Sequence, residues 1–419
     1  MHPLLILTTA LFVLFLITIR MDVVCRRQGA FPFVSFVGGY YFLFHGVLSF
    51  YAAYFVPHLP YGRDMEFSTV TFTTLFVALQ LAGYWLGMRV VPAGVRRDDA
   101  AEPVGPVIAV SWGAIVLTFL FFIFPQMNAL PSLPQLKQPC WYFGFAVLTF
   151  LSLEGRMSRL HTGLFILAVV AKFVLDTRGG LITPLVIIGV IFISAAFVLR
   201  RHRLVVMSVV LCALTIVSYG YVKYFSRVIM DSGHVNIFEF KPNLSMKSIV
   251  ASANSMARRS SHSLLTNEII KNTPSVVPFD DRNPFLDSLI NHVPRIIWPG
   301  KVKEDRGNSF GKSYGIVDQA DNQTSWNLCW TADFYITGGW YQSLFNILLV
   351  GFLLAACMRL ISFLPNRTFR FGLYISTLFP LFYQESNFSL MVGSLGWSVG
   401  FLWVSYFVAR YLLCKSKSA

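Results

Sequence analysis

Long apolar blocks joined by short polar linkers make up most of this chain. A helix needs about 20 apolar residues to span a hydrocarbon core of about 30 Å. About eleven such blocks occur, at 3–19, 30–56, 67–92, 105–125, 140–153, 163–177, 181–199, 204–221, 338–357, 371–385 and 389–412. The blocks are continuous rather than alternating, which favours helices over a β-barrel, because a helix satisfies its own backbone polar groups in lipid. The pattern predicts an all-α polytopic membrane protein with about eleven transmembrane helices.

One long polar stretch interrupts the apolar pattern and divides the chain into three parts. Residues 1–221 are expected to form an N-terminal bundle of about eight helices, and 338–419 about three more helices with a short tail. Residues 222–337 between them form a loop with the length of a small domain. A membrane protein with this much chain on one side of the bilayer usually works there.

Two amphipathic helices are predicted within the loop. The pattern over 247–271 gathers apolar residues near one face and basic residues on another, with Arg258 and His262 four apart and therefore neighbours. A second helix is expected to begin after Asn283, a good N-cap, with Pro284 in its first turn, and to end before Pro294. Both helices could lie at the outer membrane surface as a roof over the bundle. The alternative is a small soluble cap.

Composition and charge agree with this assignment. Hydrophobic residues make up 55% of the chain, charged residues 13%, and the mean hydropathy is +0.60. The net charge of +14 is unevenly placed: one set of alternate loops holds seventeen basic and five acidic residues, whereas the long loop holds 13 basic and 11 acidic. This positive-inside pattern puts the N-terminus and the long loop outside and the C-terminal tail in the cytoplasm. The net charge therefore gives no support for nucleic-acid binding.

Cofactor motifs are missing from the sequence. The six cysteines form no disulfide framework, and no Cys or His spacing typical of a metal site is present. Neither a P-loop nor a dinucleotide-binding glycine motif occurs. The sequence therefore predicts no cofactor and no metal.

Two basic segments are candidates for binding a phosphate-containing group. Arg178 stands at the end of an apolar block before two glycines, so a bulky anion could approach the backbone while the guanidinium forms a bidentate contact. The alternative is an arginine that snorkels from a helix end. Arg295, Lys301 and Arg306 form a cationic run around Trp298 and two prolines. Such a run can be a solvated surface, but a rigid one suits a pyrophosphate, with Trp298 stacking on a sugar.

Four residues are candidates for general acid–base chemistry: His262, His292, Asp333 and Glu385. Like charge from Arg258 and Arg259 is expected to lower the pKa of His262 and keep it neutral, so that it can accept a proton. Each candidate, taken alone, also has a structural interpretation. His45, inside an apolar block, is expected to be packed or hydrogen-bonded.

At three short motifs the chain resembles the O-antigen polymerase (Wzy) family of bacterial inner-membrane glycosyltransferases. The first motif runs from Phe285 to Lys301 and contains His292-Val293-Pro294-Arg295-Ile296-Ile297-Trp298-Pro299-Gly300-Lys301. The second is Phe310-Gly311 with Tyr314-Gly315. The third is Thr331-Ala332-Asp333-Phe334-Tyr335-Ile336-Thr337-Gly338-Gly339. Arg178-Gly179 also looks like the family's membrane arginine. Members often carry Glu where the loop re-enters the membrane, and here Asp333 is the nearest acid.

The resemblance implies a GT-C-like inner-membrane enzyme that polymerises repeat units linked to undecaprenyl pyrophosphate. A sugar hydroxyl of the acceptor would attack the donor's anomeric carbon, and undecaprenyl pyrophosphate would leave. Arg178, Arg258, Arg259, Arg295, Lys301 and Arg306 would stabilise that leaving group without a metal. Lipid-linked donor and acceptor, membrane lipids and a chain-length regulator are the expected partners. The alternatives are an O-antigen ligase, which transfers glycan to lipid A-core, and a non-catalytic exporter or flippase of lipid-linked sugars.

Overall fold

The computed structural model describes residues 2–25, 32–94, 104–130, 133–176, 182–217, 246–293, 297–300, 306–322, 324, 326, 328–364, 366–393 and 395–415, and every regular element within them is a helix. The first half forms α1 (Pro3–Cys25), α2 (Phe33–Tyr40), the π-helical η2 (Tyr41–Val47), α3 (Leu48–Phe55), α4 (Phe67–Val90), α5 (Gly105–Ile123), the 3-10 turns η4 (Pro125–Ala129) and η5 (Leu133–Leu136), α6 (Lys137–Glu154), α7 (Arg159–Asp176), α8 (Ile182–Val198) and α9 (His202–Val217). The second half forms α11 (Met246–Ser260), α12 (His262–Asn272), α13 (Pro284–His292), α14 (Arg306–Ser313), α15 (Trp330–Ser362), α16 (Arg367–Phe382), α17 (Phe388–Val392) and α18 (Leu395–Lys415).

Six helical stretches are long and apolar enough to cross a membrane: Pro3–Val24, Phe33–Phe55, Phe67–Val90, Gly105–Ile123, Trp330–Ser362 and Phe388–Leu413. The other five apolar blocks coincide with α6, α7, α8, α9 and α16, which are 16–18 residues long. The described chain is therefore all-helical with six candidate membrane spans. That the five shorter helices also cross the membrane stays a prediction.

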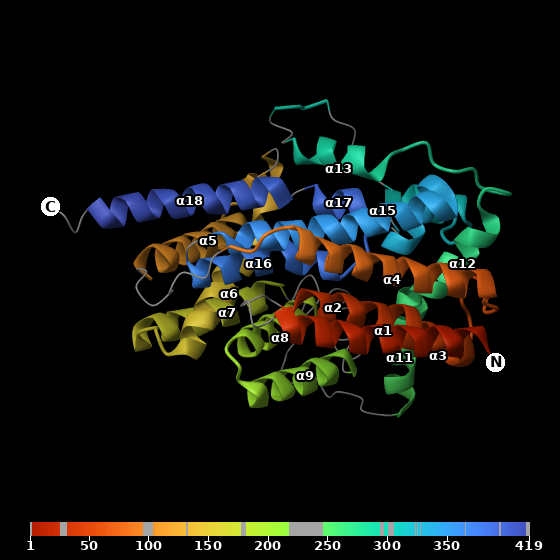
Figure 1. Ribbon diagram of the computed structural model, residues 1–419, viewed down its shortest axis with the longest axis horizontal. Coiled ribbons are helices and arrows are strands. Elements are labelled where there is room, and N and C mark those ends of the chain that lie inside the picture. The colour runs from red at the N-terminus through yellow and green to blue at the C-terminus, as the bar shows by residue number, and fades with distance from the viewer. Residues whose placement is uncertain are drawn as a thin grey trace.

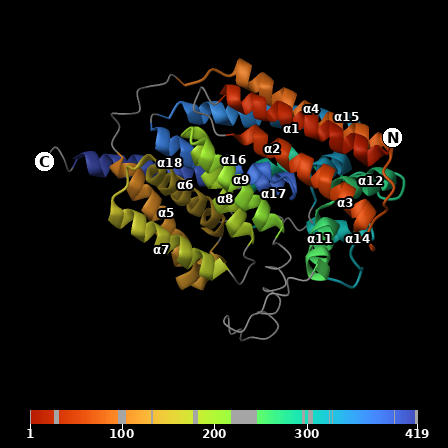
Figure 2. The same ribbon diagram turned by 90° about the horizontal axis from the view of Figure 1, so that it is seen from below.

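The long helices share one direction, which gives the molecule two distinct ends. Helices α1, α4 and α15 lie side by side along the long axis, whereas α5, α6 and α7 lie toward the end of the molecule that is away from the N-terminus (Figures 1 and 2). The N-terminus lies near α11 and α12 at one end, and α18 carries the C-terminus away at the other (Figure 1). Two helices from the polar stretch thus gather at the N-terminal end of the bundle.

Glycines allow α4 and α15 to pack backbone against backbone. A Cβ atom at Gly83 would overlap the backbone oxygen of Leu348, and one at Gly87 would lie 2.7 Å from the Cβ of Ala355. From the other side, a Cβ at Gly351 would overlap the backbone of α4. Small residues four apart permit this close approach, which membrane helices use because lipid provides no hydrophobic force between them. The pair α4 and α15 is thus a rigid support for the elements at the N-terminal end.

Two irregularities position polar side chains at that end. The π-helical η2 interrupts the stretch from Phe33 to Phe55, a distortion frequent at functional sites. Helix α15 is broken at Gly339, whose φ of 62° and ψ of −156° belong to a region that only glycine adopts readily. The nine residues before this break form a separate, largely buried segment, which we call the outer segment of α15 after the end of the molecule at which α11 and α12 gather. The expected boundary between loop and C-terminal helices, at 337/338, lies beside the break.

The two predicted loop helices had different outcomes. The second was confirmed: α13 begins at Pro284, and the Asn283 side chain accepts hydrogen bonds from the backbone N–H groups of Phe285 and Leu286. The prediction of one helix over 247–271 was wrong, because the chain breaks at Ser261 between α11 and α12. The break changes the direction in which the residues after Ser261 point, and this decides the environment of His262.

Candidate functional site

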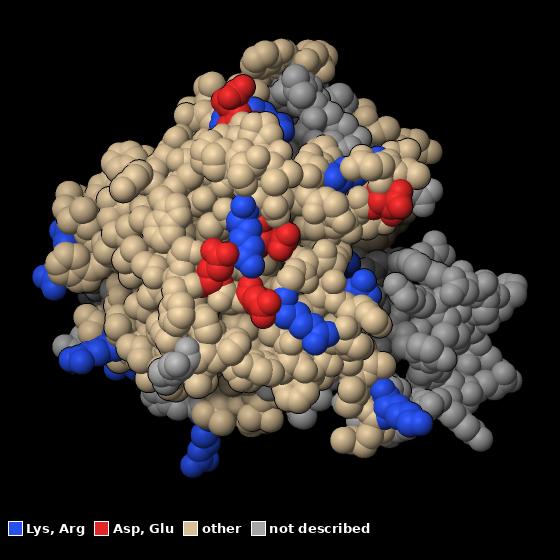
Figure 3. All heavy atoms as spheres, turned by 90° about the vertical axis from the view of Figure 1, so that its right-hand side faces the viewer, with Lys and Arg blue, Asp and Glu red and all other residues tan. Residues whose placement is uncertain are grey.

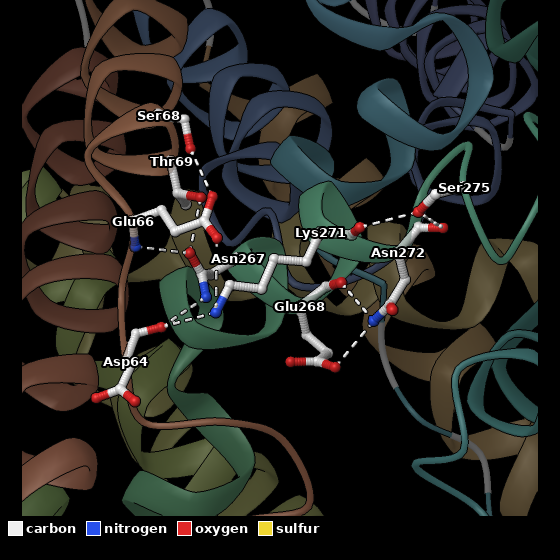
Figure 4. Close-up of polar contacts among 9 residues, drawn as sticks. All are labelled: Asp64, Glu66, Ser68, Thr69, Asn267, Glu268, Lys271, Asn272 and Ser275. Carbon is white, nitrogen blue, oxygen red and sulfur yellow. Dashed lines mark hydrogen bonds and ion pairs between the residues drawn. The ribbon is translucent and has the colours of Figure 1, made fainter.

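Contacts of Asn267 and Lys271 fix helix α12 to the start of α4. The Asn267 side chain donates to the backbone oxygen of Asp64 at 2.9 Å and accepts from the Glu66 N–H at 3.0 Å and the Thr69 hydroxyl at 2.9 Å. Lys271, one turn further along, lies 3.8 Å from the Glu66 carboxylate (Figure 4). These contacts satisfy orphan groups near the α4 N-terminus and hold the first turn of α12 against the bundle.

The first turn of α12 places His262 and Ser263 against the π-helical segment. His262 Nδ1 shares a hydrogen bond of 2.8 Å with the Tyr40 hydroxyl, and its ring stacks on Phe44 with centroids 5.5 Å apart. His45 Nδ1 shares one of 3.1 Å with the Ser263 hydroxyl. Both histidines are buried, so a segment from the polar stretch contributes to the interior of the bundle.

Burial controls the protonation of His262. Its side chain is 2% exposed, and burial lowers its pKa to about 3. The sequence predicted this direction but attributed it to Arg258 and Arg259, which are exposed on α11 across the helix break. The cause is desolvation of the charged imidazole, not like charge. Such a neutral imidazole can accept a hydrogen bond or bind a metal ion.

The loop after α16 brings Glu385 to the same place. The Tyr41 hydroxyl donates to Gln384 Oε1 at 2.5 Å, and the Gln384 backbone oxygen accepts from the Trp330 N–H at 3.2 Å. Glu385 is buried and lies within electrostatic range of the Tyr40 hydroxyl. Glu385 is therefore within electrostatic range of the same tyrosine hydroxyl that contacts His262.

The outer segment of α15 completes the arrangement. Asp333 is fully buried and its Oδ2 accepts from the Phe388 N–H, at 2.8 Å, in the first turn of α17. Thr331 shares hydrogen bonds with Thr266 of α12 at 3.0 Å and with the Cys329 thiol at 3.2 Å. Asp333 thereby links the start of α15 to the α16–α17 loop that carries Glu385.

We refer to the buried group as the outer polar cluster, made of Tyr40, Tyr41, His45, His262, Cys329, Asp333, Gln384 and Glu385. Three buried polar atoms at the cluster have no hydrogen-bond partner in the described chain: His45 Nε2, Gln384 Nε2 and Trp330 Nε1. Buried polar groups are nearly always satisfied, so such atoms need an explanation, and a bound polar ligand is one. Together with an acid and a neutral imidazole, they could hold a hydroxyl compound and accept its proton.

The remaining predicted residues lie elsewhere or outside the described residues. His292 bonds through Nδ1 to the Ser288 backbone oxygen at 2.7 Å and packs on Gly396 of α18. Trp298 is 48% exposed. Arg306 begins α14, and its side chain lies outside the described residues, as do the whole residues Arg178, Arg295 and Lys301. The structure therefore brings together His262, Asp333 and Glu385, and shows no contact of His292 with them.

Charge at this end of the molecule is mixed where it is described. Figure 3 shows acidic side chains beside basic ones across the face. Exposed Arg258 and Arg259 stand on α11, whereas Asp64 and Glu66 lie beside Lys271. Both signs of charge are therefore present at this end of the molecule.

Sequence reasoning missed the two tyrosines, Gln384 and Cys329, and expected His45 to be packed or hydrogen-bonded. The hydrogen bond between Nδ1 and Ser263 confirms that His45 is hydrogen-bonded, whereas its Nε2 has no hydrogen-bond partner among the described residues. The one available signal was the unusual density of polar aromatic groups, Tyr40-Tyr41 and His45, in an apolar block.

Comparison with protein-family models, curated proteins and solved structures gave no match to this chain.

Proposed function

We propose that the chain polymerises lipid-linked oligosaccharide repeat units at the outer face of a bacterial inner membrane. Two separate lines support this. The sequence resembles O-antigen polymerases at Phe285–Lys301 and Thr331–Gly339, and the second of these motifs supplies Asp333 to the outer polar cluster. The observation that carries the proposal is the burial of His262 against Tyr40, with Glu385 within electrostatic range of the Tyr40 hydroxyl, at the end where α11 and α12 gather.

The chemistry would proceed as follows. A sugar hydroxyl of the acceptor repeat unit attacks the anomeric carbon of the donor glycan, the bond to the pyrophosphate oxygen breaks, and the hydroxyl proton passes to Glu385, while neutral His262 accepts a hydrogen bond that orients the hydroxyl. Undecaprenyl pyrophosphate leaves with the negative charge, so it needs cations rather than an acid. Arg178, Arg295 and Lys301 fill this role by their sequence pattern.

The orientation follows the charge pattern. With the N-terminus and residues 222–337 periplasmic and the C-terminus cytoplasmic, the chain would cross the membrane about eleven times with a GT-C-like layout. The arrangement of the N-terminus with α11 and α12 at one end, and the C-terminus at the other, supports it (Figure 1). Alkaline phosphatase fused at Ala320 should be active, and the same enzyme fused after Lys415 should be inactive. The reverse result would put the site in the wrong compartment.

The activity is tested in a strain that lacks the gene. Loss of polymerase should leave surface glycan with at most one repeat unit and no ladder on a gel, and the intact gene should restore the ladder. Complementation with Glu385→Gln should reduce long chains because the proton acceptor is lost, and His262→Gln should reduce them because the hydroxyl is no longer oriented. A normal ladder in the deletion strain would refute the proposal. Loss of every repeat, including the first, would favour a ligase or a flippase instead.

Purified protein separates chemistry from export. Full-length chain in detergent, incubated with lipid-linked repeat units extracted from the deletion strain, should release undecaprenyl pyrophosphate as the glycan lengthens. A matched control is His161→Gln, a histidine on α7 at the other end of the molecule. Release without lengthening would indicate hydrolysis and would argue against polymerisation.

A further inference from the structure

Three potential metal ligands from distant parts of the chain meet in the outer polar cluster. One ring nitrogen each of His45 and His262 and the thiol of Cys329 all lie within 4.8 Å of one another, and all three side chains are buried. They come from η2, from the start of α12 and from the residue before α15. No sequence spacing could reveal such a set, because each segment supplies a single ligand.

The hydrogen bonds around the two imidazoles match those of metal-bound histidines. His45 Nδ1 contacts the Ser263 hydroxyl at 3.1 Å, and His262 Nδ1 contacts the Tyr40 hydroxyl at 2.8 Å. A histidine that binds a metal through one nitrogen almost always donates its other N–H to an oxygen acceptor, usually a carboxylate, a backbone carbonyl or a water, and this bond fixes the tautomer and the ring plane. The hydroxyl oxygens of Ser263 and Tyr40 can accept an N–H in the same way. The Nε2 of His45 is buried and has no hydrogen-bond partner among the described residues, as expected for an atom that coordinates a metal.

We propose that His45, His262 and Cys329 form a binding site for a thiophilic transition-metal ion, Zn²⁺ or Cu⁺. Two imidazoles with one thiolate suit these ions, whereas Mg²⁺ and Ca²⁺ prefer oxygen ligands. Ligand atoms around zinc at about 2.0–2.3 Å lie roughly 3.3–3.7 Å apart. Because the three atoms lie within 4.8 Å of one another, they need to close by at most about 1.1–1.5 Å, which side-chain rotation can provide. The thiol proton would leave as the thiolate–metal bond forms.

Such a metal would tie the polar stretch to the bundle. It would join η2, α12 and α15 at one point and hold the first turn of α12 in place. Its binding does not depend on glycan chemistry, so the inference goes beyond the proposed function. A metal on His262 would also leave Glu385 as the proton acceptor.

Metal analysis of the purified full-length protein tests the site. We expect about one Zn or Cu ion per chain after mild purification, and a ratio reduced at least tenfold in His45→Gln and Cys329→Ser. Cys140→Ser is the matched control, because Cys140 is also fully buried but lies on α6. Growth with added zinc or with added copper, followed by competition between the two ions, distinguishes them.

A complementary variant guards against misfolding of the single mutants. A chain with the other five cysteines changed to serine keeps Cys329 alone. Loaded with Co²⁺, it should show thiolate-to-cobalt absorption in the near ultraviolet. The proposal is overturned if this chain shows no such absorption, or if wild-type protein carries no more metal than Cys329→Ser. Because neither readout uses glycan, failure here leaves the polymerase proposal standing, and a normal ladder in the deletion strain leaves the metal site standing.

Discussion

Replacing Asn267 with Ala should loosen α12 from the bundle without unfolding the helix itself. The Asn267 amide is fully buried and makes three hydrogen bonds to residues 64–69, two as acceptor and one as donor (Figure 4). A typical hydrogen bond contributes about 0.5–1.5 kcal/mol net. The free energy of detaching α12 should therefore fall by about 2–4 kcal/mol, which corresponds to roughly a 30- to 700-fold larger detached population at about 1.4 kcal/mol per tenfold.

Cys329 reports this detachment, because α12 covers it. Its thiol is fully buried and lies 3.8 Å from the Thr266 hydroxyl of α12. In a chain with the other five cysteines changed to serine, and with a chelator present, a maleimide should label Cys329 only when α12 moves away. When closing is faster than labelling, the rate follows the open population, so Asn267→Ala should label about 30- to 700-fold faster than its parent.

The control for this experiment lies one turn along the same helix. The Asn272 side chain donates to the backbone oxygen and the carboxylate of Glu268, both within α12, at 2.9 and 2.8 Å. Asn272→Ala therefore removes an amide of the same size from α12 without touching its attachment to α4. Equal labelling rates in the two variants would refute the view that Asn267 anchors α12 and positions His262.

Three further outcomes are expected. Gly83→Ala should lower the free energy of unfolding, measured in detergent, by about 1–3 kcal/mol, because the added Cβ would overlap the backbone of α15. Gly113→Ala, which has open space around it, should be close to neutral. Equal effects of the two substitutions would exclude close α4–α15 packing. Gly339→Ala should lower the free energy of unfolding by about 1–3 kcal/mol in the same assay, because alanine is strained at the φ and ψ of Gly339. An unfolding midpoint equal to that of the wild type would argue against the break in α15. Tyr40→Phe should slow chain extension about tenfold by removing the hydroxyl bonded to His262, as measured by chain length in the deletion strain. Tyr51→Phe, whose hydroxyl bonds to α11, is its control, and similar chain lengths in the two variants would remove Tyr40 from the site.

The sequence alone established the features that depend on short stretches of chain. Continuous apolar blocks predicted helices, and each of the eleven blocks contains one in the described structure. Asn283 and Pro284 predicted the start of α13, because capping is a contact between residues two or three apart. The sequence also predicted that the pKa of His262 is lowered, so that its imidazole is neutral. Local periodicity and composition carry such information because these interactions are made within a few residues.

The tertiary structure alone decided which polar residues meet. Tyr40 and His262 are 222 positions apart, and Tyr41 and Gln384 are 343 apart, so no local pattern relates them. The break at Ser261 turned His262 inward and left Arg258 and Arg259 exposed, so burial and not like charge is the cause of its lowered pKa. Which face of a helix is buried, and against which partner, depends on the packing of the whole chain. The buried acid, the paired imidazoles and the thiol therefore became one cluster only when the helices were packed together.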